Sequence, residues 1–222
     1  MGGFKNEAIN IAFDNGVINI IVAHLIKCSK QMKTECIKNS NPLKNHEDRI
    51  TDRFVAKYLN AEPNDFRYEL QSPENFDHDT DQHIGRTDIR VISSDYFKVS
   101  SQAYFVIECK RIDGTHDLNK KYINEGVARF ISYPIKYSSY YKKNIMFGYV
   151  VQTLDISDNA DQIDKLQSSL LNEVTTTKFV LKQTDNLQYY VYSCEYASTH
   201  IERIELNHLF FDFAEAIRKD SK

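Results

Sequence analysis

The run from Ala103 to Arg111 (AYFVIECKR) is the part of the sequence that most restricts the fold. Its first part, Ala103 to Ile107, is almost continuously apolar, which is typical of a strand that is buried on both faces in the middle of a sheet. Glu108 and Lys110 are two positions apart and share one face of this strand, whereas Cys109 points to the other face. The sequence therefore predicts a central strand that carries either an ion pair at its end or a functional site.

A second acid, Asp88, lies in the preceding apolar run, Thr87 to Ile92. The mostly polar stretch Ser93 to Gln102 can return the chain, so that an antiparallel strand brings Asp88 beside Glu108. Two carboxylates suit Mg²⁺, which prefers oxygen ligands, and the Lys110 amine can orient an attacking water and offset phosphate charge. This arrangement predicts a metal-dependent phosphodiesterase site.

The segment that follows is predicted to be a crossover. Asp117 to Ser132 carries apolar residues at helical spacing, and Pro134 stops or kinks that helix. A further apolar run, Ile145 to Val151, is typical of a strand. Strand, helix and strand in this order predict a right-handed crossover between parallel strands.

At Thr87-Asp88 and Glu108-Cys109-Lys110 the chain resembles the PD-(D/E)xK nuclease superfamily, whose signature is an acid on one strand and Glu-x-Lys on the next. Thr87 stands where that family often has a proline. The likeness in element order covers Glu47 to Val151. It implies a restriction-endonuclease-like α/β fold (α+β by some schemes), in which a central mixed β-sheet is flanked by helices.

The same resemblance implies a function. It assigns Asp88 and Glu108 as ligands of Mg²⁺, for which Mn²⁺ can substitute, together with the backbone carbonyl of Cys109. Lys110 would position the attacking water. The implied activity is endonucleolytic cleavage of DNA, with RNA as the less common substrate, leaving a 5′-phosphate. The implied setting is restriction or bacterial antiviral defence, by a homodimer or within a multi-protein complex. The alternative is a catalytically inactive relative that binds nucleic acid or a protein partner in such a complex.

A helix before the sheet often supplies a further acid in that family. The stretch Asn45 to Leu59 places its apolar residues on one helical face, and Glu47 lies three residues before the first of them, Ile50. Asp48 is the competing candidate. An acid that only stabilises the helix dipole in the first turn explains Glu47 equally well.

The formal net charge of −3 argues against a general basic nucleic-acid binder, so phosphate contacts would have to be local. Basic residues do gather in sequence around the predicted site. Those predicted to contact nucleic acid are Arg86, Arg111, Lys120, Lys121 and Arg129.

The 222 residues suit a single domain, because glycine and proline are few and no linker is evident. We divide the domain into a helical N-terminal extension (1–40), a catalytic core (45–151) and C-terminal helices and strands (155–222). The elements predicted outside the core are helices at Phe4–Phe13 and Val17–Met32 separated by an Asn-Gly break, a helix at Ala160–Val174, strands near Lys178–Lys182 and Leu187–Cys194, and a closing helix at Leu206–Ile217.

The remaining sequence features indicate no membrane segment, no disulfide framework and no further metal site. The apolar run Val17 to Ile26 is too short to cross a membrane, so we expect no membrane association. The four cysteines form no Cys-x-x-Cys pair, which favours a reducing cytoplasm over a disulfide framework. His200 and His208 lack a second ligand at helical spacing, and we interpret them as structural residues.

Overall fold

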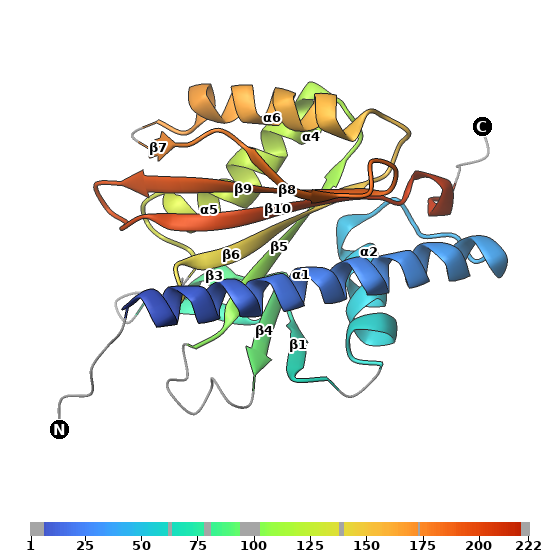
Figure 1. Ribbon diagram of the computed structural model, residues 1–222, viewed down its shortest axis with the longest axis horizontal. Coiled ribbons are helices and arrows are strands. Elements are labelled where there is room, and N and C mark those ends of the chain that lie inside the picture. The colour runs from blue at the N-terminus through green and yellow to red at the C-terminus, as the bar shows by residue number, and fades with distance from the viewer. Residues whose placement is uncertain are drawn as a thin grey trace.

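A mixed eight-stranded sheet lies between two layers of helices, as Figure 1 shows. The computed structural model describes residues 7–61, 64–77, 81–93, 103–137, 140–172 and 174–218. The predicted α/β class with a mixed sheet flanked by helices is confirmed at this level. Among the described helices, including the 32-residue N-terminal one, none is long and apolar enough to cross a membrane.

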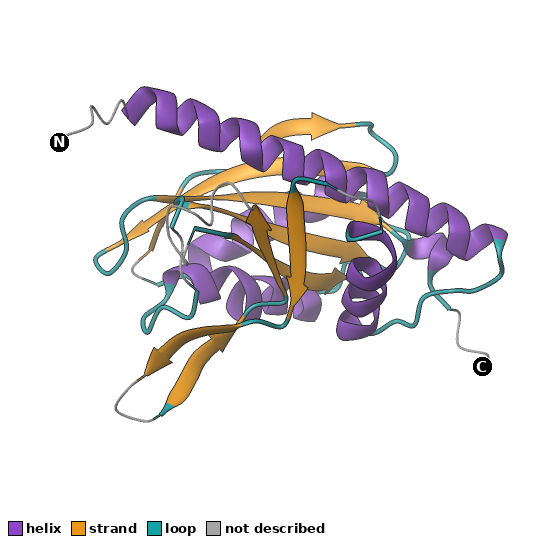
Figure 2. Ribbon diagram, turned by 90° about the horizontal axis from the view of Figure 1, so that it is seen from below, coloured by secondary structure: helices purple, strands orange, loops and turns teal. Residues whose placement is uncertain are grey.

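The central sheet has parallel strands in its middle and antiparallel strands toward both edges. Its strands, in spatial order, are β1 (Phe66–Leu70), β4 (Ile89–Ser93), β5 (Phe105–Ile112), β6 (Lys143–Val150), β10 (Ile204–Asp212), β9 (Tyr189–Ser198) and β7 (Val174–Thr176), while β8 (Val180–Thr184) also pairs with β9. The strands β2 (Pro73–Asp77) and β3 (Gln82–Arg86) form a separate hairpin. Figure 2 shows this hairpin projecting from the body of the fold.

Each face of the sheet has its own helices and its own apolar core. One face packs against α1 (Glu7–Lys38), α2 (Glu47–Phe54) and the π-helical turn η1 (Val55–Leu59). The opposite face packs against α4 (His116–Lys121), η2 (Tyr122–Val127), α5 (Ala128–Ile131) and α6 (Ile156–Leu170). A short 3₁₀ turn, η3 (Ala214–Ala216), follows β10.

The predicted core elements are confirmed. β4 and β5 pair antiparallel, with Ile89 opposite Ile107, and β5 and β6 pair parallel across the helical segment from α4 to α5. The helix predicted at Asn45–Leu59 is present as α2 and η1. The turn predicted between β4 and β5 lies largely outside the described residues, since 94–102 are not described.

The predicted N-terminal helices form one helix, and the predicted Asn-Gly break is wrong. α1 continues through Gly16, whose added Cβ would meet nothing within 4 Å, and it extends past Met32 to Lys38. A glycine inside a helix costs only about 1 kcal/mol. The buried stripe that follows, including Ile21 and Leu25, outweighs that cost by anchoring the helix to the sheet. Phe4, where the first helix was predicted to begin, lies outside the described residues.

The closing helix predicted at Leu206–Ile217 is also wrong, because this segment forms β10 and only a short 3₁₀ turn. β10 lies between β6 and β9, and its side chains alternate between the two cores. Leu206 and Phe210 pack on the α6 side, while Leu209 and Phe211 pack on the α1 side. A strand buried on both faces is almost continuously apolar, and that pattern also satisfies helical spacing.

The other C-terminal predictions are confirmed with shifted boundaries. The predicted strands are present as β8 and β9, and the predicted helix is α6. It begins earlier than predicted, at Ile156, since the Asp155 carboxylate accepts a hydrogen bond from the Asp158 backbone N–H and caps it. It ends at Leu170, and Val174 begins β7. Because β10 pairs directly with β6, the segment 155–222 completes the same sheet as the segment 45–151.

Candidate active site

Asp88 immediately precedes β4 and reaches across to β5. Its Oδ2 accepts a hydrogen bond of 2.7 Å from the backbone N–H of Cys109. The antiparallel register, which pairs Ile89 with Ile107, brings the Asp88 carboxylate to the stretch of β5 that carries Glu108 and Lys110. Strand pairing therefore fixes the first acid beside the Glu-x-Lys segment.

The Lys110 ammonium lies at the centre of the site. Its Nζ is 2.8 Å from Glu108 Oε1, 2.9 Å from Glu47 Oε1 and 3.9 Å from Asp88 Oδ2. It also donates a hydrogen bond of 2.9 Å to the Cys109 carbonyl. Three carboxylates from three elements thus meet at one amine, of which the side chain is only 7% exposed.

Glu47 joins α2 to the end of β5. In addition to its contact with Lys110, its Oε2 accepts a hydrogen bond of 3.1 Å from the backbone N–H of Arg111. The Arg111 guanidinium donates in turn to the carbonyl and the side-chain oxygen of Asn45, just before the helix. Of the two acids that the sequence left open, Glu47 makes these contacts, while Asp48 lines the adjoining cavity.

Cys109 directs its thiol away from this site, as strand alternation predicts. The Tyr149 hydroxyl donates a hydrogen bond of 3.1 Å to Cys109 Sγ and lies 3.1 Å from the Thr51 hydroxyl oxygen. Burial raises the pKa of the Cys109 thiol well above its ordinary value, so the thiol stays protonated. Cys109 therefore contacts the charged residues through its backbone, with its N–H bound to Asp88 and its carbonyl to Lys110.

Tyr137 and Arg129 hold the Glu108 carboxylate from the other side. The Tyr137 hydroxyl donates a hydrogen bond of 2.5 Å to Glu108 Oε2, and Arg129 Nε lies 3.5 Å from Glu108 Oε1. Arg129 also donates to the Tyr137 hydroxyl oxygen. The sequence did not predict the contact of Tyr137 with Glu108, because Tyr137 lies in the loop after α5, where neither periodicity nor spacing relates it to the strand.

Burial controls the protonation of the two strand acids. Glu108 is fully buried, and desolvation, with the Asp88 charge added, raises its pKa to about 8. Desolvation also raises the pKa of Asp88, although Lys110 and the Cys109 N–H oppose the shift. The neighbouring carboxylates raise the pKa of Lys110 above its ordinary value despite burial. At neutral pH the site therefore holds an ammonium and a largely protonated Glu108.

This protonation predicts a pH dependence of stability. An acid with a raised pKa in the folded state stabilises the fold fully below its unfolded value, here 4.5, and that contribution is lost as the pH rises through about 8. As the pH rises across this window, ionisation of Glu108 should lower the free energy of unfolding by up to about 1.4 kcal/mol per pH unit. Urea unfolding of the metal-free protein at pH 5 to 8 measures the slope, and Glu108→Gln should flatten it. Equal slopes for the two proteins would contradict the assignment.

The chemistry of the donors fits a magnesium ion, although a complete ligand cage is not preformed. Glu108 Oε1 is buried and, among the described residues, has ion-pair contacts but no hydrogen bond. In the same part of the chain, no three His, Cys, Asp or Glu side chains are grouped so that they could hold a metal ion. Asp88, Glu108 and the Cys109 carbonyl are oxygen donors, the ligand type that a hard cation prefers, and a bound cation would favour the ionised form of Glu108.

The predicted nucleic-acid contacts occupy different environments. Arg86 is exposed and lines a cavity of about 550 Å³ together with Asp88, Lys110 and Lys136. Arg111 and Lys121 line a smaller cavity of about 220 Å³, which Glu47 also lines. The other two predicted contacts, Arg129 and Lys120, are placed less suitably for binding nucleic acid. Arg129 lines the larger cavity, but its guanidinium is engaged with Glu108. Lys120 is exposed on α4 and lines neither cavity.

The β2–β3 hairpin forms one wall of the larger cavity. Gly85 packs so closely against the loop after α5 that an added Cβ would lie 2.2 Å from the Lys136 carbonyl oxygen. Gly126 allows a similarly close approach on the helical side, where a Cβ would lie 2.5 Å from Met146 Cε and 3.3 Å from Lys110 Cγ. These two glycines let the hairpin and η2 pack directly around the charged residues.

The two C-terminal histidines lie apart from this cluster. His208 is fully buried, with Nδ1 2.9 Å from the Tyr122 hydroxyl and Nε2 3.0 Å from the Tyr196 hydroxyl. Burial lowers its pKa to about 3, so the ring is neutral and hydrogen-bonded on both nitrogens. His200 packs against the exposed Tyr133 ring. These contacts agree with a structural interpretation of both residues.

We compared the chain with protein-family models, with curated proteins and with solved structures. No match was found in any of the three comparisons.

Proposed function

We propose that the protein is a Mg²⁺-dependent nuclease that hydrolyses phosphodiester bonds of DNA with a restriction-endonuclease-like fold. The observation that carries this proposal is the convergence of Glu47, Asp88 and Glu108 on the Lys110 ammonium, beside a cavity lined by Arg86 and Lys136. Acids grouped this closely, one of them fully buried, are unfavourable for folding unless cations offset them, which supports a functional reason for the cluster.

Each residue has a role in this proposal. Asp88, Glu108 and the Cys109 carbonyl would hold the ion, which when bound would activate a water molecule and offset phosphate charge. Lys110 has a raised pKa and stays an ammonium, so it would orient the nucleophile or bind a phosphate oxygen rather than remove a proton. Glu47 would keep Lys110 in place and connect α2 to the site.

One feature favours a second candidate, a catalytically inactive relative that binds nucleic acid or a protein partner. Tyr137 and Arg129 already engage Glu108, and Lys110 occupies the space among the acids. A site in which the ammonium permanently neutralises the carboxylates would have structural value without catalysis. Both candidates include a role in restriction or antiviral defence. Both also include assembly as a homodimer or within a multi-protein complex.

The direct test is cleavage of a mixed panel of duplex DNA, single-stranded DNA and RNA by the purified protein in Mg²⁺ or Mn²⁺. Cleavage that is lost in EDTA and in a Glu108→Gln protein supports the nuclease and identifies its substrate. If no substrate is cleaved but one of these nucleic acids binds without metal, the result would contradict the nuclease and support the inactive relative.

Metal binding should also be visible without catalysis. A ligand that binds only the folded state stabilises it by about 2.7 kcal/mol at 100 times its Kd, which corresponds to a rise in Tm of roughly 5 to 10 °C for a chain of this size. We expect Mg²⁺ to raise the Tm of the wild-type protein and to leave that of Glu108→Gln unchanged, as measured by differential scanning fluorimetry. An equal rise in both proteins would show that the ion binds elsewhere.

A further inference from the structure

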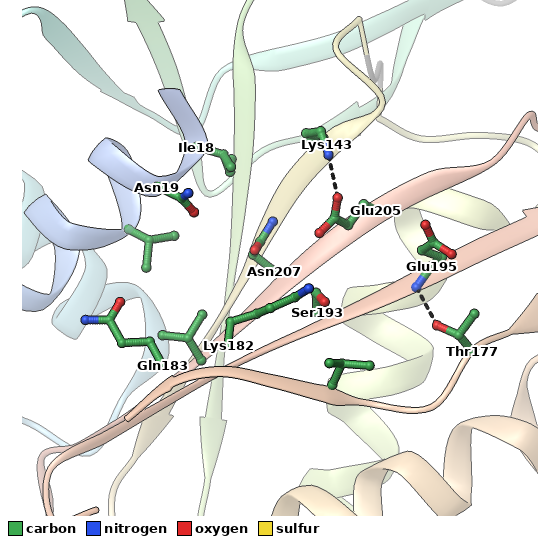
Figure 3. A pocket seen from close by; sticks show the side chains of 13 residues that line it. Ile18, Asn19, Lys143, Thr177, Lys182, Gln183, Ser193, Glu195, Glu205 and Asn207 are labelled. Atoms are coloured by element: carbon green, nitrogen blue, oxygen red, sulfur yellow. Dashed lines mark hydrogen bonds and ion pairs between the residues drawn. The ribbon is translucent and has the colours of Figure 1, made fainter. Parts of the chain in front are cut away.

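A second concave site lies between α1 and the strands β8, β9 and β10, on the sheet face covered by α1. It has a volume of about 960 Å³, within the range of small-molecule sites, and shares no lining residue with the cavity beside Lys110. Ile18 and Val22, one turn apart on α1, form one wall, and Val180 of β8 lies across from them. Figure 3 shows the polar side chains gathered on the floor.

The floor is a polar row on otherwise apolar strands. In the β9–β10 register Asn207 lies opposite Ser193, and Glu205 lies opposite Glu195. One step further along the same face, Leu209 lies opposite Val191, and both belong to the apolar core under α1. The sheet face thus changes from apolar to polar where it enters the groove.

Asn207 has an unmet hydrogen-bonding requirement in this groove. The residue is 5% exposed, and its Nδ2 is buried without a hydrogen-bond partner among the described residues. A buried amide donor without an acceptor lowers the stability of the fold, so native proteins usually satisfy it with protein, water or ligand. Figure 3 places Asn207 between α1 and Glu205, among the residues that line the groove.

One basic residue that lines the groove, Lys182, has no ion-pair partner in the described part of the chain. Lys143 pairs with Glu205, and Glu195 pairs with Arg203. Both acids that line the groove are thus paired with a basic residue, and the Lys182 ammonium is available to a bound anion.

A strand irregularity directs Lys182 into the groove. In the pairing of β8 with β9, Leu181 lies opposite Tyr192 and Gln183 opposite Val191, so Lys182 is the extra residue of a β-bulge. Bulges re-aim side chains and are frequent beside functional sites. In Figure 3 the Lys182 side chain extends across the floor toward Ser193.

We propose that this groove binds a small organic anion. Its acidic group, a carboxylate or a phosphate monoester, is held by the Lys182 ammonium and the Asn207 amide, and its apolar body packs against Ile18, Val22 and Val180. This site is independent of the proposed nuclease activity, since none of its residues belongs to the Lys110 cluster.

The test is a fluorescence titration of the full chain with 1-anilinonaphthalene-8-sulfonate, an organic anion with an apolar body. We expect saturable binding at one site, at least tenfold weaker binding of the uncharged analogue N-phenyl-1-naphthylamine, and at least fivefold weaker binding of the anion to Lys182→Met and to Asn207→Leu. Lys178→Met, which changes an exposed lysine outside the groove, is the matched control and should bind as the wild type does.

Two further measurements test whether a loss of binding is caused by unfolding and which acidic group the groove binds. Asn207→Leu should keep or raise the Tm, because it removes an unsatisfied donor, whereas loss of binding through unfolding would lower it. Displacement of the dye by decanoate identifies a carboxylate ligand, and displacement by adenosine monophosphate identifies a phosphate ligand. Dye binding that is absent, that is unchanged in Lys182→Met, or that resists both competitors overturns the proposal.

Discussion

Glu108→Gln is expected to reduce DNA cleavage by roughly three orders of magnitude or more while leaving the protein folded. The carboxylate is fully buried, and its pKa of about 8 means that the metal-free site already holds it largely protonated at neutral pH. Glutamine has the shape and the charge of that protonated form. It can keep the contacts with Tyr137 and Lys110 at little cost, but it cannot supply the anionic oxygen that a metal ion requires.

Single-turnover cleavage in Mg²⁺, alongside circular dichroism and urea unfolding at pH 7, measures both halves of this expectation. Glu69→Gln is the matched control, because Glu69 pairs with Arg90 between β1 and β4, outside the Lys110 cluster, and should retain near-normal cleavage. A Glu108→Gln protein that cleaves at the wild-type rate would remove Glu108 from the catalytic assignment.

Lys110→Met is expected to lower the free energy of unfolding by about 3–5 kcal/mol at neutral pH, the typical cost of removing one partner from a buried ionic group. Three acids depend on this ammonium, and one of them, Glu108, is inaccessible to water that could replace it. Methionine keeps most of the side-chain volume, so the loss reports charge rather than packing. Cleavage should also be lost, but from a protein that is less stable, in contrast to Glu108→Gln.

Chemical denaturation at pH 4 and pH 7 tests this origin. The destabilisation should shrink at pH 4, where protonated carboxylates no longer repel one another, and the double variant Lys110→Met/Glu47→Gln should be more stable than Lys110→Met alone. Lys136→Met, which changes an exposed lysine on the same cavity, serves as the control and should alter stability by less than about 0.5 kcal/mol. A Lys110→Met protein as stable as wild type would mean that the acids do not need this cation.

The two variants together separate catalytic loss from structural loss. At neutral pH Glu108→Gln leaves the charge of the site nearly unchanged, because Glu108 is already largely protonated, whereas Lys110→Met removes the ammonium that offsets Glu47 and Asp88. A large loss of stability in Lys110→Met alone, with loss of cleavage in both variants, would be difficult to explain by a purely structural ion pair, which would predict no catalytic loss at all.

The sequence by itself was sufficient for the elements whose patterns are local. The apolar run before Glu108 identified β5, the spacing from Asp117 to Ser132 identified the crossover helix, and Pro134 marked its end. Strand alternation also predicted that Glu108 and Lys110 share a face while the Cys109 thiol points away. These features follow from the periods of helices and strands, which depend only on neighbouring residues.

The tertiary structure decided what depends on distant segments. Helical spacing at Leu206–Ile217 gave way to a strand because the segment is buried between β6 and β9, with a core on each face. The choice of Glu47 over Asp48 required the position of α2 against β5, and the contacts of Tyr137 and Arg129 with Glu108 required the path of the loop after α5. The polar groove under α1 likewise exists only where β8, β9 and β10 meet that helix. Burial and charge compensation arise from residues far apart in the chain, so the local periodicity of the sequence does not predict them.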